Sequence, residues 1–477
     1  MAAKELLVVG GGLTGLAAAW EASRVPGLKV TLVEKETRLG GKVATASFPG
    51  GYLEKGPDSF LLREPGFVQF LKDLGLYSSL QEPETLAPLI RFGGRFHRLP
   101  EGLAGIAPWH RGYLRSSLLS LKGKAAVTRD LFLPPRGDAP WEDESFFDFA
   151  SRHFGEEWAQ RVVAPLYGGI YAGDAKELST AALQPSWVKD EREEGSLIRA
   201  AQKRRQAGKA GPPFRTLPRG LQDLVKALEE DLVRRGVELR RGEEARSLDV
   251  LEGKVRLTTG KGLLFGDGVV LSLPAPQAGK LLETRAPRLA RLLMGQAWVS
   301  SGALLFRITE TEKRNALAGH PLFQGSGFLV PRGEGKVITG ATVLSRKWPQ
   351  LSRGAFHLRL FVGRRHEEEI LSLPDDLLWE RAWRELQRFA GPLPLPDEVL
   401  VSRFPLAFPQ YRVGHGPWLE EVRREEGKWP WLFLAGTSYE GVAIPDAVRQ
   451  GREAGQKVVR FLSGPPQPPS ISKALDR

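Results

Sequence analysis

The stretch that decides the fold is Glu5-Leu6-Leu7-Val8-Val9-Gly10-Gly11-Gly12-Leu13-Thr14-Gly15. Residues 5–9 form a short apolar run, typical of a buried parallel strand, and lead directly into three glycines. An alanine-rich helix is expected at residues 16–23 and a second strand at residues 29–34. Together they make a strand–helix–strand unit, so we expect an α/β fold that begins with a Rossmann-like unit.

The glycine loop between the first strand and the helix predicts a dinucleotide site. In Gly10-x-Gly12-x-x-Gly15 the first glycine permits a tight turn, the second admits a diphosphate, and the third lets helix and strand pack closely. The start of the helix adds unpaired N–H groups and the positive end of its dipole. Glu34 ends the second strand, where its carboxylate suits ribose hydroxyls and repels a 2′-phosphate, which disfavours NADP.

Composition limits the chemistry that the chain can perform. A length of 477 residues implies more than one domain. The chain has no cysteine, which excludes disulfides, thiolate nucleophiles and cysteinyl attachment of a cofactor. The seven histidines show no metal-ligand spacing, so we expect no metal site.

The net charge is +12, and much of the excess lies in residues 199–215, with Lys203, Arg204, Arg205 and Lys209. We interpret this stretch as a solvated, mobile loop and not as a nucleic-acid site, because no nucleic-acid-binding motif accompanies it. No apolar run reaches the roughly 18–20 residues that span a bilayer. The first strand begins close to Met1, which leaves no room for a signal peptide, so we expect a cytoplasmic protein.

More glycine-rich turns follow the expected ribose acid. One places Arg38 and Lys42 around a glycine pair, and Gly56-Pro57-Asp58-Ser59 forms another. This continuation resembles the flavin-containing amine oxidase superfamily, in which such segments line the diphosphate and the isoalloxazine of FAD. The resemblance implies a resident, non-covalent FAD. The expected cofactor-binding residues are Gly10, Gly11, Gly12, Leu13, Thr14, Gly15, Glu34, Lys35, Arg38, Gly40, Gly41, Lys42, Gly56, Pro57, Asp58, Ser59, Ala245, Thr437, Val442, Ala443 and Ile444.

Segments far from the amino terminus narrow the resemblance. Leu178-Ser179 and the residues before it are similar to the "GxYAGD…LS" segment of protoporphyrinogen oxidases, which here reads Gly169-Ile170-Tyr171-Ala172-Gly173-Asp174. Residues 327–331, 408–415 and 435–446 also resemble segments of that family, in the family's order. The chain is therefore identified as a member of the protoporphyrinogen and coproporphyrinogen III oxidase family.

The resemblance implies an α/β fold in three parts: a discontinuous Rossmann-like FAD domain, a mixed-sheet substrate domain and a helical insertion, as in amine oxidases. The order of predicted strands and helices agrees with this division. The expected parts are residues 1–85, 213–275 and 409–463 for FAD, 86–100 and 276–408 for substrate, 101–212 for the helical domain, and a disordered tail at 464–477.

The resemblance also implies a reaction in haem biosynthesis. A porphyrinogen, either protoporphyrinogen IX or coproporphyrinogen III, passes hydride from a methylene bridge to flavin N5, and dioxygen reoxidises the flavin with release of hydrogen peroxide. Aromatisation favours the reaction, so the protein mainly has to position the macrocycle in a dry slot.

Three residues are expected to position the substrate. By resemblance, the Gly169 carbonyl faces the pyrrole nitrogens, while Leu329 and Phe361 pack on the rings. Taken singly, Leu329 and Phe361 are better explained as core residues and Gly169 as a turn glycine, so the prediction depends on the joint match. Val442, Ala443 and Ile444 should lie beside the flavin, with Ile444 at the start of the last helix.

One position departs from the family's pattern. Many protoporphyrinogen oxidases have an arginine that pairs with a substrate propionate where this chain has Pro88. Arg91 is three residues further along the same strand and should point to the opposite face. Arg63, Arg91 or Arg95 could anchor the carboxylates instead, and the choice between the two porphyrinogens stays open.

Other functions on the same fold are a flavin amine oxidase or desaturase, and a non-catalytic carrier of the GDI type that lacks FAD. An intact glycine loop with Glu34 argues against the carrier. The expected partners are the porphyrinogen and dioxygen, with no nucleic acid. Peripheral contact with the inner face of a membrane through residues 103–121, and hand-off to a ferrochelatase, are further hypotheses.

Overall fold

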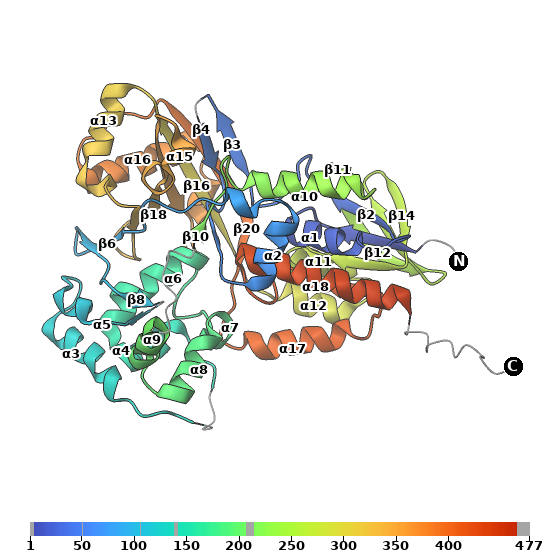
Figure 1. Cartoon of the computed structure of the whole chain (residues 1–477), viewed down its shortest axis with the longest axis horizontal. Helices are drawn as coiled ribbons and strands as arrows, with labels where there is room; N and C mark the ends of the chain where they lie inside the picture. The colour runs from blue at the N-terminus through green and yellow to red at the C-terminus, as the bar shows by residue number, and fades with distance from the viewer. Residues whose placement is uncertain (1–3, 50, 105, 138–141, 207–213, 465–477) are drawn as a thin grey trace, which may run out of the picture.

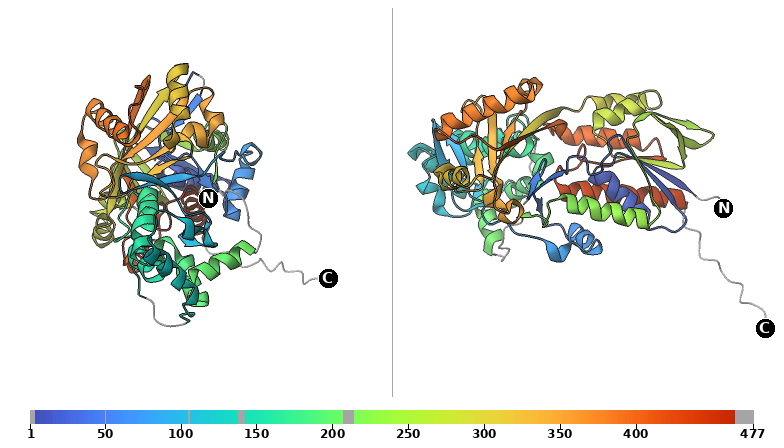
Figure 2. Two further views of the ribbon diagram at one scale, coloured as in Figure 1. Left: turned by 90° about the vertical axis from the view of Figure 1, so that its left-hand side faces the viewer. Right: turned by 90° about the horizontal axis from the view of Figure 1, so that it is seen from above.

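A computed structural model describes residues 4–49, 51–104, 106–137, 142–206 and 214–464 of the chain. Figure 1 shows a parallel sheet with its helices near the amino terminus, a mixed sheet beside it, and a group of helices below the mixed sheet. Figure 2, seen from above, places the mixed sheet and the helical group together at the end of the molecule away from the amino terminus.

The parallel sheet has five strands in the order β11-β2-β1-β15-β21, drawn from the beginning, middle and end of the chain. All four neighbouring pairs are parallel, as in a Rossmann-type sheet. This arrangement confirms the expected discontinuous α/β fold. The strands are β1 (Glu5–Val9), β2 (Lys29–Glu34), β11 (Glu238–Arg241), β15 (Gly268–Leu271) and β21 (Leu432–Leu434).

Helices α1 (Leu13–Ala22), α10 (Gln222–Arg234) and α18 (Ile444–Ser463) share one core on this sheet. Two glycines let α18 lie directly on α1, as Figure 1 shows. A Cβ atom at Gly451 would lie 2.2 Å from the Thr14 carbonyl oxygen, and one at Gly455 would lie 2.8 Å from that of Ala18. The last helix is therefore held beside the start of the first helix.

The other face of the parallel sheet packs against helices α11 (Ala275–Leu282) and α12 (Pro287–Met294) and a three-stranded antiparallel sheet. The division expected from the sequence starts the second substrate segment at residue 276, whereas the core around the parallel sheet continues to Leu293. The strands of the small sheet are β12 (Ala245–Leu251), β13 (Lys254–Thr259) and β14 (Gly262–Gly266).

The mixed sheet has seven strands in the order β20-β16-β19-β18-β17-β6-β7. Its neighbours are antiparallel except for β17 and β6. Helix α16 (Asp375–Ala390) covers one face. The strands are β6 (Pro88–Phe92), β7 (Arg95–Arg98), β16 (Trp298–Ile308), β17 (Gly327–Leu329), β18 (Ile338–Val343), β19 (Phe356–Val362) and β20 (Glu398–Pro409).

Strand β20 was missed by the sequence analysis because Pro405 interrupts it. Proline lacks the N–H that a central strand needs, but β20 is an edge strand. The pairing with β16 also shifts register between Val299 and Ser301, opposite the proline.

The remaining short strands and helices around the two large sheets are β3 (Thr45–Phe48), β4 (Gly51–Glu54), β5 (Phe60–Leu61), β10 (Phe214–Arg215), α2 (Pro65–Asp73), α13 (Thr311–Gly319), α14 (Leu344–Lys347), α15 (Pro349–Ser352) and α17 (His415–Glu426).

The helical region has an aromatic core of its own, built around Phe146, Phe149, Phe154 and Trp158. A short strand pair precedes the helices, β8 (Leu103–Ala104) with β9 (Ala107–Pro108). The helices are α3 (Leu121–Arg129), α4 (Phe146–Phe154), α5 (Glu156–Trp158), α6 (Ala164–Tyr171), α7 (Thr180–Leu183), α8 (Pro185–Glu194) and α9 (Leu197–Gln206).

The interpretation of residues 199–215 as a loop is wrong for its described first part, which is the end of α9. The helix forms because Leu197, Ile198 and Ala201 give it a buried face. Its cations lie on the other side, where Arg204 pairs with Asp190. Lys209 and the expected tail beyond residue 464 lie outside the described residues.

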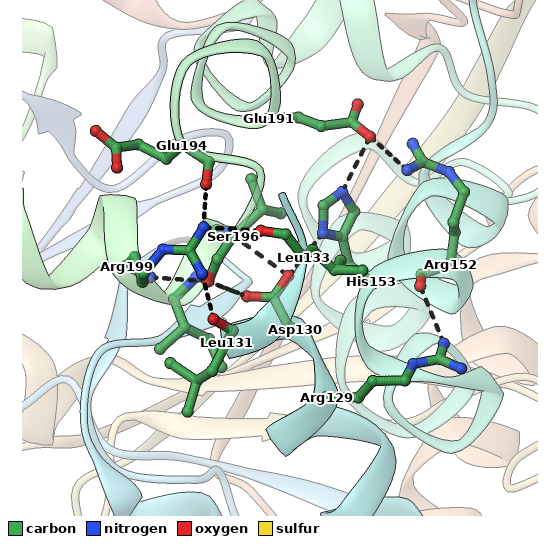
Figure 3. Close-up of polar contacts among 12 residues, drawn as sticks. Arg129, Asp130, Leu131, Leu133, Arg152, His153, Glu191, Glu194, Ser196 and Arg199 are labelled. Atoms are coloured by element: carbon green, nitrogen blue, oxygen red, sulfur yellow. Dashed lines mark hydrogen bonds and ion pairs between the residues drawn. The ribbon is translucent and has the colours of Figure 1, made fainter. Parts of the chain in front are cut away.

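A buried ionic cluster joins α4, α8 and α9 (Figure 3). His153 Nδ1 lies 2.7 Å from Asp130 Oδ1, and its Nε2 lies 3.6 Å from Glu191 Oε1. Asp130 also accepts hydrogen bonds from the Ser196 hydroxyl and the Ile198 amide. Burial lowers the pKa of His153, but its carboxylate partners outweigh burial and raise the pKa above its usual value.

A raised pKa makes the contribution of His153 to stability depend on pH. The contribution is complete below about pH 6.5, the unfolded value, and disappears as the pH rises through the folded value. We expect His153→Gln to destabilise the protein by about 1–3 kcal/mol at pH 6, and by less as the pH is raised. Urea unfolding at several pH values measures the difference. His366→Gln removes a half-exposed histidine that is also paired with a carboxylate, Glu177, and serves as the control.

Candidate functional site

The glycine loop leaves a cradle above the start of α1. A Cβ atom at Gly15 would lie 1.9 Å from the Gly10 carbonyl oxygen, so only glycine fits there. Gly10 itself has φ +105°, which favours glycine. A Cβ atom at Gly12, in contrast, would meet no atom of the described residues within 4 Å. The loop is therefore closed toward the sheet at Gly15 and open at Gly12, in front of the helix N-terminus.

Glu34 lies at the edge of this cradle. Its Oε2 accepts a hydrogen bond from the Gly11 amide at 2.6 Å, and its Oε1 accepts one from the Glu36 amide at 2.9 Å. Each carboxylate oxygen has further acceptor capacity, which ribose hydroxyls could use. Ala245 begins β12 close by, since the Glu243 amide donates to the Glu34 carbonyl.

The turn after Glu34 is held by its own side chains. Arg38 donates to the carbonyl oxygens of Leu39, Gly41 and Val43, so its guanidinium organises the turn from within. Lys35 is exposed and lies 3.7 Å from Glu36.

Lys42, in the same turn, is a cation that remains available to a ligand. The structure gives its ammonium group no hydrogen bond or ion pair with any described residue, and the group lies 5.0 Å from the centre of the Trp298 ring. Burial lowers the pKa of Lys42 to about 8.

The second glycine turn touches the first, because a Cβ atom at Gly56 would lie 2.0 Å from the Lys42 carbonyl oxygen. Asp58, in the same turn, lies 2.9 Å from both Lys347 Nζ and an Arg359 terminal nitrogen. Burial raises the pKa of Asp58, but these two cations outweigh it and hold the pKa well below its usual range. Asp58 was expected at the cofactor; it is engaged with the mixed sheet, and Ser59 donates to it.

The start of α18 closes the cradle from the other side. Ala443 precedes the helix, and its amide donates to Asp446 at 3.0 Å, while Ile444 is the first helical residue. A Cβ atom at Gly436 would lie 3.8 Å from Thr14 Oγ1, so the turn before α18 faces the start of α1. Val442 reaches the helical core, and the Thr437 carbonyl accepts the Tyr411 hydroxyl.

The three expected substrate-positioning residues come together. Leu329 on β17 pairs with Gly340 on β18, which pairs with Phe361 on β19, so the three share one face of the mixed sheet. Gly340 has no side chain, which leaves a gap in the row between Leu329 and Phe361. Gly169, on α6, faces this row, because a Cβ atom there would lie 2.8 Å from Leu329 Cδ2.

The cations expected near the substrate are placed differently. Ile90 pairs with Leu329, so Arg91 points to the opposite face, as predicted. There its guanidinium lies 4.1 Å from the centre of the Phe389 ring and donates to the Glu334 carbonyl. Arg63 and Arg95 are exposed.

A parallel sheet with an open glycine cradle, joined to a mixed sheet with an apolar row, is an arrangement typical of dinucleotide-dependent oxidoreductases. The chain belongs to the flavin containing amine oxidoreductase family, whose sequence profile matches residues 13–459. Family membership identifies an enzyme with a flavin cofactor and disfavours the carrier alternative.

Several known proteins match this chain over almost its whole length. Coproporphyrinogen III oxidase of Bacillus subtilis is 31% identical, over 96% of this chain and 98% of its own. Human protoporphyrinogen oxidase is 30% identical, over the same shares. A crystal structure of an Exiguobacterium sp. 255-15 protein, named as a candidate protoporphyrinogen oxidase, has a TM-score of 0.85 at 30% identity and covers 97% of this chain and 100% of its own.

Among the described residues, no group of three or more His, Asp or Glu side chains is arranged to hold a metal ion. Within the same residues, no helix combines the length and the hydrophobicity needed to cross a membrane.

The cradle fits a flavin dinucleotide. The open space at Gly12 suits a diphosphate at the helix N-terminus, Lys42 offers an unpaired positive charge, and Glu34 keeps acceptor capacity for a ribose.

Three residues of the site were not predicted from the sequence, because each acts through a partner more than 10 residues away in the chain: Gly340, Lys347 and Arg359. The register of β17, β18 and β19 would have indicated Gly340 and Arg359, whereas Lys347 lies on helix α14.

We expect Gly12→Val to abolish flavin binding while the protein still folds. Gly12 has φ −71° and an open surrounding, so valine meets no steric conflict within the protein and fills only the space for the diphosphate. Flavin absorbance of the purified variant and its far-UV circular dichroism measure the two effects. Gly416→Val, also in an open position at the start of a helix, is the control. A yellow Gly12→Val protein would contradict the assignment.

We expect Lys42→Met to change two quantities in opposite directions. Without cofactor the variant should be more stable by about 1 kcal/mol, because an uncompensated half-buried charge is removed. Its affinity for FAD should fall about tenfold, because a cation near the diphosphate is lost. Thermal unfolding of the apoprotein and titration with FAD measure the two effects; weaker binding together with lower apoprotein stability would indicate a structural role.

Proposed function

We propose that this protein is an oxygen-dependent porphyrinogen oxidase with non-covalent FAD, acting in haem biosynthesis. The observation that carries the proposal is the apolar row of Leu329, Gly340 and Phe361 facing Gly169, next to the two glycine turns. Two similar enzymes, from Bacillus subtilis and from human, are named for coproporphyrinogen III and protoporphyrinogen, which supports a porphyrinogen as the substrate class.

One set of residues binds the cofactor, and another set positions the substrate. Glu34, the Gly12 cradle and Lys42 bind the dinucleotide, and Val442, Ala443 and Ile444 bring the start of α18 to the flavin. Bound FAD supplies the acceptor for hydride from a methylene bridge, and dioxygen is the final oxidant, with hydrogen peroxide as by-product.

The substrate side needs shape more than strong acid–base chemistry. Leu329 and Phe361 present apolar surface to a planar ring system, and the Gly169 backbone can face the pyrrole nitrogens because glycine has no side chain between them. An apolar slot excludes water and holds the methylene bridge near the flavin. No general base has to be assigned, since aromatisation of the macrocycle provides the driving force.

The proposal covers both porphyrinogens, and direct assay distinguishes them. Protoporphyrinogen IX and coproporphyrinogen III are each supplied aerobically, and porphyrin fluorescence is followed against an enzyme-free control. We expect porphyrin to form faster than by autoxidation from at least one of them. Equal rates with and without enzyme for both substrates would refute the proposal, and the ratio of the two rates defines the preferred substrate.

A variant links the activity to the slot. We expect Gly169→Val to retain flavin and to lower porphyrin formation more than tenfold, because its side chain enters the gap beside Leu329. The fold should tolerate it, since the atom it meets is the flexible end of a leucine side chain. Gly168→Ala is the control, because its Cβ atom would make an ordinary 3.5 Å contact with the Gly173 carbonyl oxygen. Equal activity of the two variants would show that Gly169 does not face the substrate.

A further inference from the structure

A buried cation, Arg359, and a partly buried one, Lys347, share one carboxylate between the second glycine turn and the mixed sheet. Asp58 pairs with Lys347 and with Arg359, and the side chains of Asp58 and Arg359 are only 6% and 4% exposed. Glu54 is a further acid beside this cluster, and burial raises its pKa to about 8, so it is mainly neutral at pH 7. The cluster therefore carries one positive charge in excess.

The cluster also has donors without acceptors. Arg359 uses its terminal nitrogens on Asp58 and on the carbonyls of Glu54 and Gly56, while its buried Nε finds no acceptor among the described residues. Lys347 Nζ donates to Asp58 at 2.9 Å and to Ser59 at 3.4 Å, which leaves one of its three N–H groups for another acceptor. The Lys347 side chain keeps 13% of its surface exposed, so a ligand can reach it.

The position of this cluster in the sheet connects it to the substrate. Pro88 pairs with Gly327, Gly327 with Thr342, and Thr342 with Arg359, so Pro88 and Arg359 belong to one cross-strand row. This row is adjacent, on the same face, to the row of Leu329, Gly340 and Phe361. The Arg359 guanidinium lies 4.8 Å from the centre of the Phe361 ring.

Lys347 lies at the same end of the sheet as the start of β6. Its carbonyl accepts a hydrogen bond from the Glu84 amide at 3.1 Å, four residues before Pro88. The side chain of Lys347, which follows β18, thus brings a positive charge to the region where Pro88 offers none.

We propose that Lys347 binds a carboxylate of the substrate, with Asp58 and Arg359 as the positioning residues that orient its ammonium group. A bound carboxylate would compensate the excess charge and accept the remaining N–H of Lys347. The inference rests on the proposed function, because it assigns the propionate side chains of a porphyrinogen to this cluster. Arg359 stays in contact with the protein and keeps Asp58 in place.

The experiment measures binding of the product porphyrin to the flavin-loaded protein. Coproporphyrin III, with its free carboxylates, is compared with its tetramethyl ester in the same detergent buffer, by quenching of porphyrin fluorescence. We expect Lys347→Met to weaken binding of the acid about tenfold and to leave binding of the ester unchanged. Lys347→Arg, which keeps the charge, should retain most of the affinity for the acid.

Lys313→Met is the matched control, because Lys313 is also a partly exposed lysine paired with a carboxylate, 3.0 Å from Asp397, on the far helix α13. We expect it to change neither affinity. An equal loss for acid and ester in Lys347→Met, or a loss of bound flavin, would overturn the inference in favour of a purely structural cluster. If the wild-type protein binds neither porphyrin and forms none from either porphyrinogen, the proposed function itself has failed.

Discussion

Among the described glycines, the tightest backbone approach is at Gly15, where a Cβ atom would lie 1.9 Å from the carbonyl oxygen of Gly10. It sets the distance between α1 and the parallel sheet, and it aims the N-terminus of α1 over the open position at Gly12. Helix α18 takes its place from α1 through Gly451 and Gly455, and the residues before α18 then face the same opening. The geometry of most of the proposed cofactor site therefore depends on the close approach of Gly15 to the backbone of Gly10.

A second constraint joins the two sheets. Asp58 belongs to a turn near the start of the chain. Lys347, 289 residues further on, ends helix α14, which follows β18, and Arg359, 301 residues further on, lies on β19 of the mixed sheet. Because Asp58 and Arg359 are buried, their separation would leave charges unpaired away from water, which costs several kcal/mol. The ion pairs thus fix how the apolar row around Phe361 lies relative to the glycine turns. The proposed function requires this relation to be rigid, because the cofactor and the substrate have to be aligned.

Local patterns explain what could be predicted from the sequence. Strands β1 and β2 were predicted with correct bounds because their apolar runs are uninterrupted, and the glycine loop has a spacing with a direct physical meaning. The opposite orientation of Arg91 followed from strand alternation alone. The combination of Leu329 and Phe361 with Gly169 came from resemblance and not from periodicity.

Non-local features escaped the same reasoning. Strand β20 contains a proline that is tolerated only at a sheet edge, and edge position depends on the whole topology. The part of helix α9 after residue 199 was interpreted as a loop because it is rich in cations, although the helix has apolar residues for a buried face. The roles of Gly340 and Arg359 depend on the register of β17, β18 and β19, which no local pattern contains.

The order of strands in the parallel sheet has a consequence for synthesis on the ribosome. Its central strand, β1, is made first, but its neighbour β15 follows more than 250 residues later and β21 later still. Such a topology has a high contact order and completes slowly, after most of the chain has left the exit tunnel. Helix α18, which closes the cradle, is the last described helix to emerge. The cradle is therefore assembled only after residues 5–463 have all been synthesised, so a dinucleotide cannot occupy it at an earlier stage.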